Sequence, residues 1–256
     1  AAKLAVLRRR GCGRVSVNPQ SMSDAVLAAM GRAHRAADIL GAFALVRESG
    51  IGCVNMDLIA GLPGDSADGF RASLDQVLEL APENVTVHTL ALKKGSRLMN
   101  GAPNKGKALV GERTSGGMSE LPWKQGSEGY KAREDEGDTP LPAGKDVAAM
   151  LDYAWAALRE SGQIPYYLYR QKYMSGSFEN VGWCLPGTES LYNICMMEEL
   201  HTIVSLGGGG VTKLVDRHTG YIQRVANAKY PQEYIQKIDA ICADKARVAE
   251  FCRQHG

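Results

Sequence analysis

The sequence feature that most constrains the fold is the stretch 54–64, V-N-M-D-L-I-A-G-L-P-G. Its apolar run predicts a strand that is buried on both faces, as in a parallel sheet. One acid, Asp57, interrupts the run, and a Gly-Leu-Pro-Gly turn follows it, so Asp57 is expected near the C-terminal end of the strand. Ligands bind at that end of the strands in α/β folds. Asp57 is therefore either a ligand contact or a carboxylate that nearby backbone N–H groups satisfy.

The stretch belongs to a repeated strand–helix pattern over the first 92 residues. Such β–α units predict a parallel sheet with right-handed crossovers. The first ten residues have the character of a helix interior, so we expect further β–α units before them. Strands are expected at 14–18, 54–60 and 85–92, and helices at 24–30, 36–49 and 66–80.

Composition limits the classes of function. A net charge of +2 over 256 residues is too small to favour nucleic acid or a membrane surface as a partner. No apolar run approaches the roughly 20 residues that a membrane span needs. None of the six cysteines lies within four residues of another, which argues against a self-contained zinc or iron–sulfur site. This cysteine usage suits a reduced, cytoplasmic protein, with Cys53, Cys195 and Cys242 as buried thiols.

The composition changes in the middle of the chain. Glycine, proline, lysine, glutamate and serine dominate there, and we expect 100–142 to be a long, mostly disordered insertion between the parts 1–99 and 143–256. After the insertion, the pattern predicts a helix at 146–161, strands at 166–170, 202–206 and 221–225, and a last helix that starts at Pro231 and continues toward Cys252.

Polar residues mark the end of each visible strand. Asn18 and Gln20 follow the first strand, Asp57 lies in the second, and His88 and Thr89 lie in the third. The C-terminal ends of parallel strands share one rim, so these side chains favour a binding site. Gln20 offers a donor and acceptors, and an ionised Asp57 only accepts, which together suit a ligand with hydroxyl and amino groups, such as a nucleoside.

Arg32 is expected at a helix break near this rim. It is either a solvated helix-end cation or a clamp on a carboxylate, which a guanidinium holds with two hydrogen bonds. His34 and His88 have no partner at a metal-ligand spacing, so structural roles are favoured for both.

Two further patterns leave alternatives open. The run 207–210 is four glycines, but it lacks the frame of a phosphate-binding loop and indicates a turn, either flexible or close to a ligand. The tyrosine cluster at 166, 167, 169 and 173 is either core packing, which we favour slightly, or one wall of a site for a flat, hydrophobic ligand.

Several motifs then resemble a known family. R-V-S-V-N-P-Q-S-M, M-G-R-A-H, N-M-D-L-I-A-G-L-P-G and V-T-V-H-T-L-A-L occur in the order found in oxygen-independent coproporphyrinogen III dehydrogenases, which are radical SAM enzymes. The later P-Y-Y-L-Y-R-Q-K-Y-M-S-G-S-F-E-N-V-G-W, with Y-N-I, M-E-E and S-L-G-G-G-G-V-T-K, is similar to the HemZ-like branch. The resemblance covers nearly the whole chain apart from the insertion.

The resemblance implies an α/β fold: the C-terminal half of a partial (β/α)6 radical SAM barrel, followed by a smaller α+β region. It implies S-adenosylmethionine (SAM) and a [4Fe-4S] cluster as cofactors. Gln20, Arg32, Asp57 and Ala91 match positions that contact SAM, and Val211 matches a position near a second SAM. The implied partners are a tetrapyrrole substrate and an electron donor such as flavodoxin or ferredoxin.

The sequence departs from the family in one large respect. The C-x-x-x-C-x-x-C cluster loop, the G-G-G-T-P motif and a glutamate-bearing strand are absent, so we expect this chain alone to form no cluster and to be inactive.

Two functions stay open. One is oxidative decarboxylation of the propionates of coproporphyrinogen III, started by hydrogen abstraction by a 5′-deoxyadenosyl radical. The other is a haem-binding chaperone of the same family, whose H-N-x-x-Y-W motif survives here only as Asn193.

Overall fold

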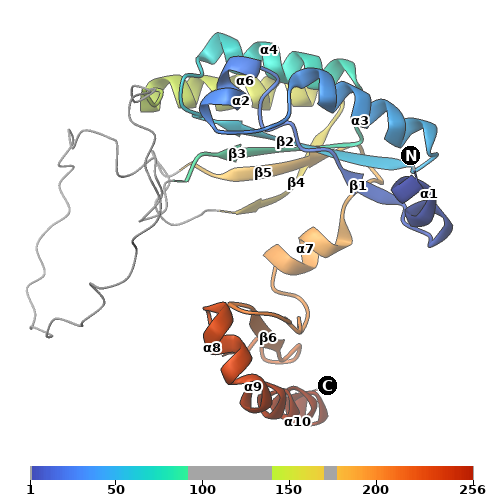
Figure 1. The fold of residues 1–256 in the computed structure, drawn as a ribbon, viewed down its shortest axis with the longest axis vertical. Coiled ribbons are helices and arrows are strands. Elements are labelled where there is room, and N and C mark those ends of the chain that lie inside the picture. Colours follow the sequence, from blue (N-terminus) through green and yellow to red (C-terminus); the bar gives the residue numbers. More distant parts are fainter. Residues whose placement is uncertain (1, 92–139, 170–177, 256) are drawn as a thin grey trace, which may run out of the picture.

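The computed structural model describes residues 2–91, 140–169 and 178–255 (Figure 1). The chain forms a five-stranded sheet with the order β1-β2-β3-β5-β4 and a separate two-stranded sheet. The first three strands are parallel, as the strand–helix pattern predicts, whereas β5 runs antiparallel to both β3 and β4. The strands of the large sheet are β1 (Arg14–Ser16), β2 (Cys53–Ala60), β3 (Asn84–Thr89), β4 (Ile164–Tyr169) and β5 (Asn180–Cys184).

Helices cover one face of this sheet (Figure 1). Their apolar stripes meet the apolar side chains of the strands in one core, which includes Met56, Phe70 and Trp183, each at most 2% exposed. The side chains of Ser23 and Ser66 cap two of the helices by accepting hydrogen bonds from backbone N–H groups of the first turn. The helices of this part are α1 (Ala2–Arg9), α2 (Asp24–Ala29), α3 (Ala36–Glu48), α4 (Ala67–Glu79) and α6 (Gly144–Glu160).

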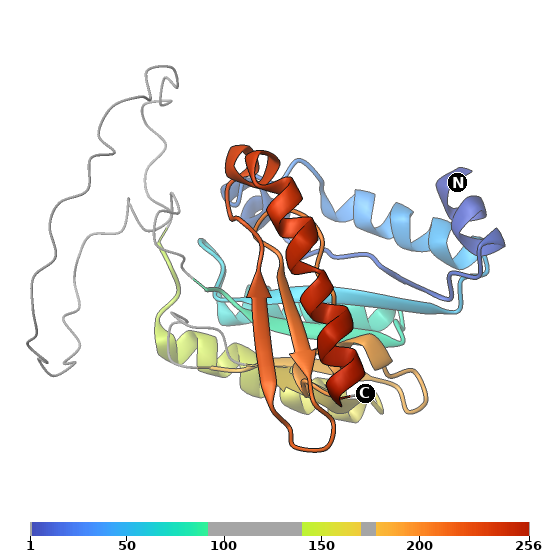
Figure 2. The ribbon, with the colours of Figure 1, turned by 90° about the horizontal axis from the view of Figure 1, so that it is seen from below.

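The C-terminal part lies on the other side of the sheet. Figure 1 shows α7 below the sheet, and Figure 2, seen from below, shows the small hairpin and the last helices in front of it. A second, small core of Leu214, Val225 and Phe251 holds the hairpin against the last helix. The elements are α7 (Leu191–Met197), β6 (Val211–Val215), β7 (Ile222–Ala226), α8 (Pro231–Gln236), α9 (Ile238–Asp244) and α10 (Ala246–His255).

The structure corrects the expected strand at 202–206. Only Ile203 pairs there, in an isolated bridge with Lys213, and the strand is β6, which follows the four glycines. Side chains replace the missing ladder, because the hydroxyl of Thr202 accepts from the N–H of Val215 and the hydroxyl of Thr212 accepts from the N–H of Ser205. Polar side chains that bond to the backbone offer it an alternative to a strand.

The expected single helix from Pro231 is also wrong, because the chain forms three short helices there. The break at Lys245 lets its ammonium group donate to the carbonyl oxygen of Ser205, the hydroxyl of Thr212 and the amide oxygen of Asn227. Phe251 of the following helix then packs on the hairpin. Tertiary contacts therefore override a helical pattern that would have continued.

Two burial predictions are wrong as well. The strand around Asp57 is not buried on both faces, because its residues alternate between buried and half-buried. Among the cysteines, Cys242 is exposed, Cys53 and Cys195 are half-buried, and Cys184 is the buried one.

The expected insertion 100–142 lies outside the described residues as far as residue 139. The domain limits at 99 and 143 stay predictions. In the described ranges, α6, β4 and β5 belong to the same layers as β1, β2 and β3. No helix within those ranges is long and apolar enough to cross a membrane.

Candidate functional site

One face of the five-stranded sheet is polar. In β2 the side chains of Val54, Met56 and Leu58 enter the helix-covered core, so the residues between them point to the opposite face. Register pairs Asp57 with Thr86 of β3, which brings polar side chains of neighbouring strands side by side. We call the following group the polar sheet face: Asn55, Asp57, Thr86, His88, Tyr167 and Tyr169.

Asp57 is the centre of this face. Its Oδ1 accepts a hydrogen bond from the amide of Asn55 at 2.7 Å, and its Oδ2 lies 3.6 Å from Nε2 of His88. Burial raises the pKa of Asp57, but the neighbouring His88 ring and the amide of Asn55 outweigh burial and hold the pKa below its usual value. Asp57 is therefore an anion at neutral pH, with acceptor sites left over.

His88 connects Asp57 to a tyrosine. Its Nδ1 lies 3.2 Å from the hydroxyl of Tyr169. An ionised carboxylate can only accept, so the ring proton of a neutral His88 lies on Nε2, toward Asp57, and Nδ1 accepts the hydroxyl proton of Tyr169. The three side chains form one line of polar contacts from β2 over β3 and β5 to β4, with a hydrogen bond between Tyr169 and His88 and a longer, 3.6 Å approach between His88 and Asp57.

Two tyrosines form one wall of the site. The rings of Tyr167 and Tyr169 are stacked with their centroids 6.3 Å apart, and burial raises the pKa of Tyr167 to about 12. Gly182 of β5 makes room for this wall, because a Cβ atom at that position would lie 1.8 Å from the Tyr167 ring. The tyrosine cluster therefore lines the polar sheet face; Tyr173 lies outside the described residues.

The structure brings Gln20 and Asp57 together. The N–H of Gln20 donates to the carbonyl oxygen of Asp57, and the carbonyl of Gln20 accepts from the N–H of Ile59, each at 2.9 Å. Gln20 has a φ of +67°, a left-handed conformation that is uncommon for a residue other than glycine. Such backbone strain gathers at functional sites, which agrees with the rim predicted from the sequence.

Arg32 and Ala91 border the same end of the sheet. Arg32 is exposed in the loop between α2 and α3, and His34 of that loop lies within 3.3 Å of the carbonyl oxygen of Pro19, which precedes Gln20. Ala91 is half-buried and follows β3, where the N–H of Leu90 donates to the carbonyl oxygen of the last residue of β2.

Val211 is not part of this group, because it begins β6 in the separate two-stranded sheet. Its side chain is 46% exposed. The predicted contact of Val211 with a second ligand therefore concerns another region of the chain.

Three members of the polar sheet face were not favoured as site residues in the sequence. His88 was noted at the rim, but a structural role was favoured for it, and the tyrosines at 167 and 169 were slightly favoured as core packing. The signal that could have found them is the alternation of β3 and β4, which places His88, Tyr167 and Tyr169 at every second position of their strands.

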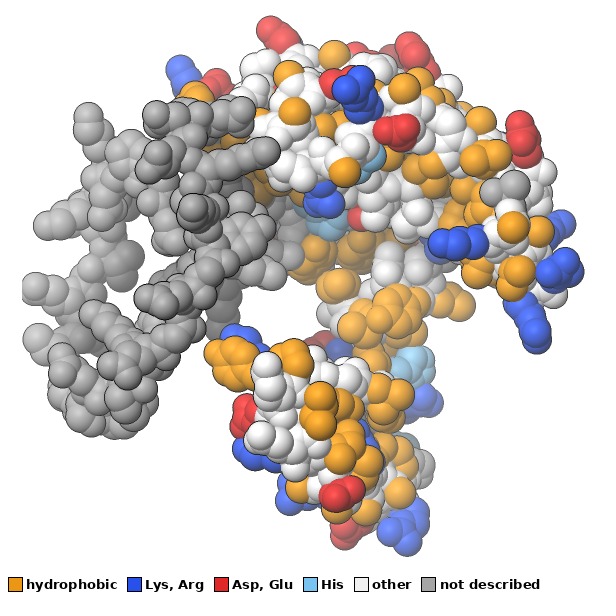
Figure 3. Space-filling view, in the orientation of Figure 1, with side chains coloured by type: hydrophobic (Ala, Val, Ile, Leu, Met, Phe, Trp, Pro, Cys, Tyr) orange, Lys and Arg blue, Asp and Glu red, His pale blue; other side chains and the backbone are white. Residues whose placement is uncertain are grey.

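The polar sheet face looks onto a hollow. Figure 3 shows this hollow between the helix-covered sheet and the C-terminal part, with histidine, basic and acidic side chains beside hydrophobic ones at its upper edge. The described residues contain no group of three or more histidine, cysteine or acidic side chains that could hold a metal ion. The site thus offers hydrogen-bonding groups and aromatic rings to an organic ligand.

The first 77 residues match the sequence profile of the radical SAM superfamily. Over 97% of its length the chain is 38% identical to the oxygen-independent coproporphyrinogen-III oxidase-like protein HemZ of Bacillus subtilis, of which it covers 43%. It is also 32% identical, over 93 residues, to the haem chaperone HemW of the same organism, which amounts to 36% of this chain and 24% of HemW. The chain therefore spans less than half the length of these relatives.

A solved structure shares the fold. The coproporphyrinogen III oxidase HemN of Escherichia coli superposes with a TM-score of 0.60 over 93% of this chain and 46% of HemN, at 18% sequence identity. The α/β fold with a partial parallel barrel is therefore confirmed, and the polar sheet face lies on the side of the sheet that the helices leave uncovered.

Proposed function

We propose that this chain, a member of the radical SAM superfamily, supplies the SAM-binding side of an enzyme that oxidatively decarboxylates a coproporphyrinogen-type tetrapyrrole. The observation that carries the proposal is the anionic Asp57 on the polar sheet face, with the strained Gln20 bonded to its backbone. A carboxylate in the C-terminal half of β2 and a glutamine whose backbone bonds to the same residue suit the hydroxyl and amino groups of an adenosyl moiety.

The side chains present fit SAM. The carboxylate of Asp57 accepts one hydrogen bond from the Asn55 amide and faces His88. It can therefore accept further hydrogen bonds from ligand hydroxyl groups. In the proposal Gln20 and Asp57 hold the nucleoside, and the guanidinium of Arg32 holds the methionine carboxylate. Ala91, which follows β3 at the same end of the sheet, lies beside them. SAM, when bound, supplies the radical chemistry of the superfamily.

The residues of this chain do not fit a [4Fe-4S] cluster. All six cysteines lie in the described ranges and are free, and no three potential ligands there are grouped. Iron–sulfur clusters need cysteine thiolates, so in the proposal the cluster and the electron donor, such as flavodoxin or ferredoxin, act from outside this chain.

The tyrosine wall suits a tetrapyrrole. Tyr167 and Tyr169 present stacked aromatic faces on the polar sheet face, and flat rings prefer such offset or edge-on contacts. In the proposal this wall holds the substrate ring while Asp57 and Gln20 hold SAM.

A haem-binding chaperone is the second candidate. The 93-residue similarity to HemW favours it, and α7 exposes Leu191 and Tyr192, which are 75% and 70% exposed. Exposed apolar side chains of this kind are typical of a contact surface for a ligand or partner.

Two assays on the complete gene product separate the candidates. In an anaerobic assay with SAM, a reductant and coproporphyrinogen III, the enzyme forms products that have lost carbon dioxide, and mass spectrometry detects them. In a haemin titration, a chaperone shows a saturable Soret shift. Product formation without tight haem binding supports the proposed enzyme, whereas haem binding without product contradicts it and supports the chaperone.

A further inference from the structure

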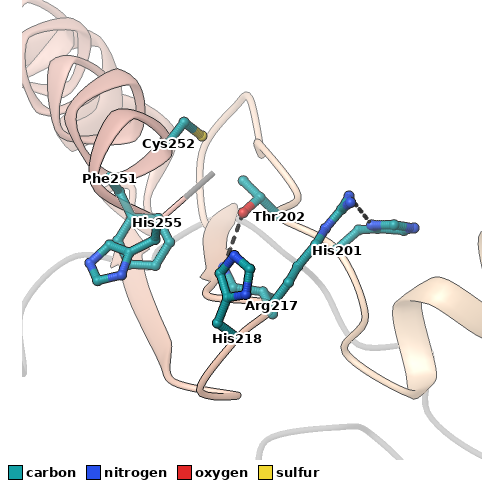
Figure 4. Close-up of a pocket in the computed structure, with 8 residues that line it drawn as sticks. His201, Thr202, Arg217, His218, Phe251, Cys252 and His255 are labelled. Carbon is teal, nitrogen blue, oxygen red and sulfur yellow. Dashed lines mark hydrogen bonds between the residues drawn. The ribbon is translucent and has the colours of Figure 1, made fainter.

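A second cavity, with a volume of about 640 Å³, lies in the C-terminal part (Figure 4). Its size falls in the range of small-molecule sites, roughly 300–1,000 Å³. We call it the C-terminal cleft; it is lined by His201, Thr202, Val215, Arg217, His218, Phe251, Cys252 and His255. The segment between α7 and β6, strand β6, the turn after it and helix α10 build it, so it shares no side chain with the polar sheet face.

The lining is rich in hydrogen-bond donors. Nη2 of Arg217 lies 2.6 Å from Nδ1 of His201. A guanidinium can only donate, so Nδ1 of His201 accepts, and the proton of this ring lies on Nε2 as a further donor. Figure 4 shows His218 and Thr202 in the middle of the cleft, the guanidinium of Arg217 beside the ring of His201 on one side, and Phe251 and His255 on the other.

The carboxylate of Asp216, the residue before Arg217, is fully occupied by hydrogen bonds. Asp216 is 4% exposed and accepts hydrogen bonds from the backbone N–H groups of His218 and Thr219, from the Thr219 hydroxyl and from Nδ1 of His255. The Thr219 hydroxyl above all, with the N–H of His218, holds the pKa of Asp216 well below its usual range. Asp216 therefore orients His255 and leaves Arg217 without a carboxylate partner among the described residues.

The cleft also has an apolar side. Phe251 and Val215 are 6% and 8% exposed, and the Phe251 ring stacks against His255 with the centroids 4.4 Å apart. A ligand that combines an oxyanion with an apolar body would match both sides of the cleft. A metal ion fits less well, because no three potential ligands in the described ranges are grouped closely enough.

We propose that the C-terminal cleft binds an organic oxyanion, with Arg217 holding a carboxylate or phosphate group and the apolar body resting against Phe251. Planar guanidinium groups bind both oxyanions through two parallel hydrogen bonds. The proposal does not depend on the proposed radical SAM activity.

The test uses the five histidines of the 256-residue chain as reporters. Histidine-labelled protein is titrated with phenyl phosphate, with 3-phenylpropionate and with uncharged 3-phenylpropanol, and NMR follows the ring signals. We expect at least one anion to shift the signals of His201, His218 and His255 saturably, while His34, His88 and the alcohol titration stay unchanged. The anion that binds more tightly identifies phosphate or carboxylate as the natural group.

The Arg217→Ala variant should bind that anion at least tenfold more weakly. The matched control is Arg247→Ala, an exposed arginine of α10 that pairs with Asp244 and does not line the cleft; its affinity should equal that of the wild type. Unshifted His34 and His88 signals show that a variant is folded. Absence of any shift in the cleft histidines, or equal affinity of the wild type and Arg217→Ala, overturns the proposal.

Discussion

The polar sheet face and the C-terminal cleft contain the same pair of side chains in two different settings. In both, an aspartate faces a histidine ring: Asp57 faces His88 at 3.6 Å, and Asp216 faces His255 at 3.0 Å. The side chain of Asp57 is 20% exposed and keeps unused acceptor sites, whereas that of Asp216 is 6% exposed and is saturated by its own turn. The pair in the sheet therefore keeps acceptor capacity on its aspartate, whereas the aspartate in the cleft only supports a histidine.

The difference has a structural origin. Asp57 is held by strands that are fixed in register across the sheet, so its partners come from β2 and β3 and its free oxygen positions face the hollow. Asp216 is held by a local turn, in which His218 and Thr219 supply most of its donors. The turn around Asp216 therefore fills its carboxylate with donors, whereas the strands around Asp57 supply it with one hydrogen bond from Asn55 and the ring of His88.

The largest change in stability is expected for Gly182→Ala, because Gly182 makes room for the tyrosine wall of the polar sheet face. In Gly182→Ala the new Cβ overlaps the Tyr167 ring, so the wall must move, and we expect a loss of about 3 kcal/mol in the free energy of unfolding, the upper range for overpacking. The control is Gly41→Ala in α3, where no atom lies within 4 Å of a new Cβ. That change should be neutral or stabilise by up to about 1 kcal/mol. Equal urea-unfolding curves for the two variants would disprove the tyrosine wall.

A smaller loss in the free energy of unfolding is expected for Asp57→Asn, and the size of this loss should depend on pH. Because the pKa of Asp57 is lowered in the folded chain, its ionised form stabilises the fold above the pKa of an unfolded aspartate, near 4, and this contribution is lost as the pH falls through the folded pKa. We expect the variant to unfold about 1–2 kcal/mol more easily at pH 7, with the gap closing below about pH 4.

Asp68→Asn is the matched control for this pH series. Asp68 is exposed and pairs only with Arg71 three residues away, at 3.2 Å, so its loss should change the free energy of unfolding by less than about 1 kcal/mol. A gap between wild type and Asp57→Asn that is constant from pH 7 to pH 3 would contradict the assigned partners of Asp57.

The smallest change in stability is expected in the C-terminal cleft. Arg217 is exposed and bonds only to the exposed His201 among the described residues, so Arg217→Ala should change the free energy of unfolding by no more than about 0.5 kcal/mol. Chemical denaturation of the two proteins checks this. A loss above 1 kcal/mol, on the order of a core change, would mean that Arg217 supports the fold rather than a ligand.

Much of the sheet region could be predicted from the sequence, because its signals are local. Apolar spacing and capping serines located α2, α3 and α4, and the run before Gly61 located β2. In the C-terminal part, the strand Val211–Val215 was missed and a strand was wrongly expected at 202–206. There the hydroxyl groups of Thr202 and Thr212 bond to the backbone in place of a strand ladder, and no sequence periodicity reveals such bonds.

The candidate site was predictable only in part. Asp57 stands out in an apolar run and Gln20 follows a strand end, so the sequence singled out both as candidates at the rim. His88 lies in β3, directly beside β2, where the strand–helix pattern predicted it. Tyr167 and Tyr169 join the site through the antiparallel pairing of β5 with β3 and β4, across about 80 residues of sequence, as their contacts with Thr86 and His88 show. Long-range pairing of this kind has no local signal, and the space that Gly182 leaves for Tyr167 is visible only in three dimensions.

The central claim is that Asp57 on the polar sheet face is a ligand acceptor, and SAM affinity tests it most directly. Calorimetric titration of SAM into the complete gene product should show that Asp57→Asn weakens binding by about 1–3 kcal/mol, or roughly 5- to 150-fold in Kd, the range for losing a hydrogen bond to a charged group. Asp68→Asn should bind SAM like the wild type. An unchanged Kd in a folded Asp57→Asn protein would contradict the claim and return Asp57 to a structural role.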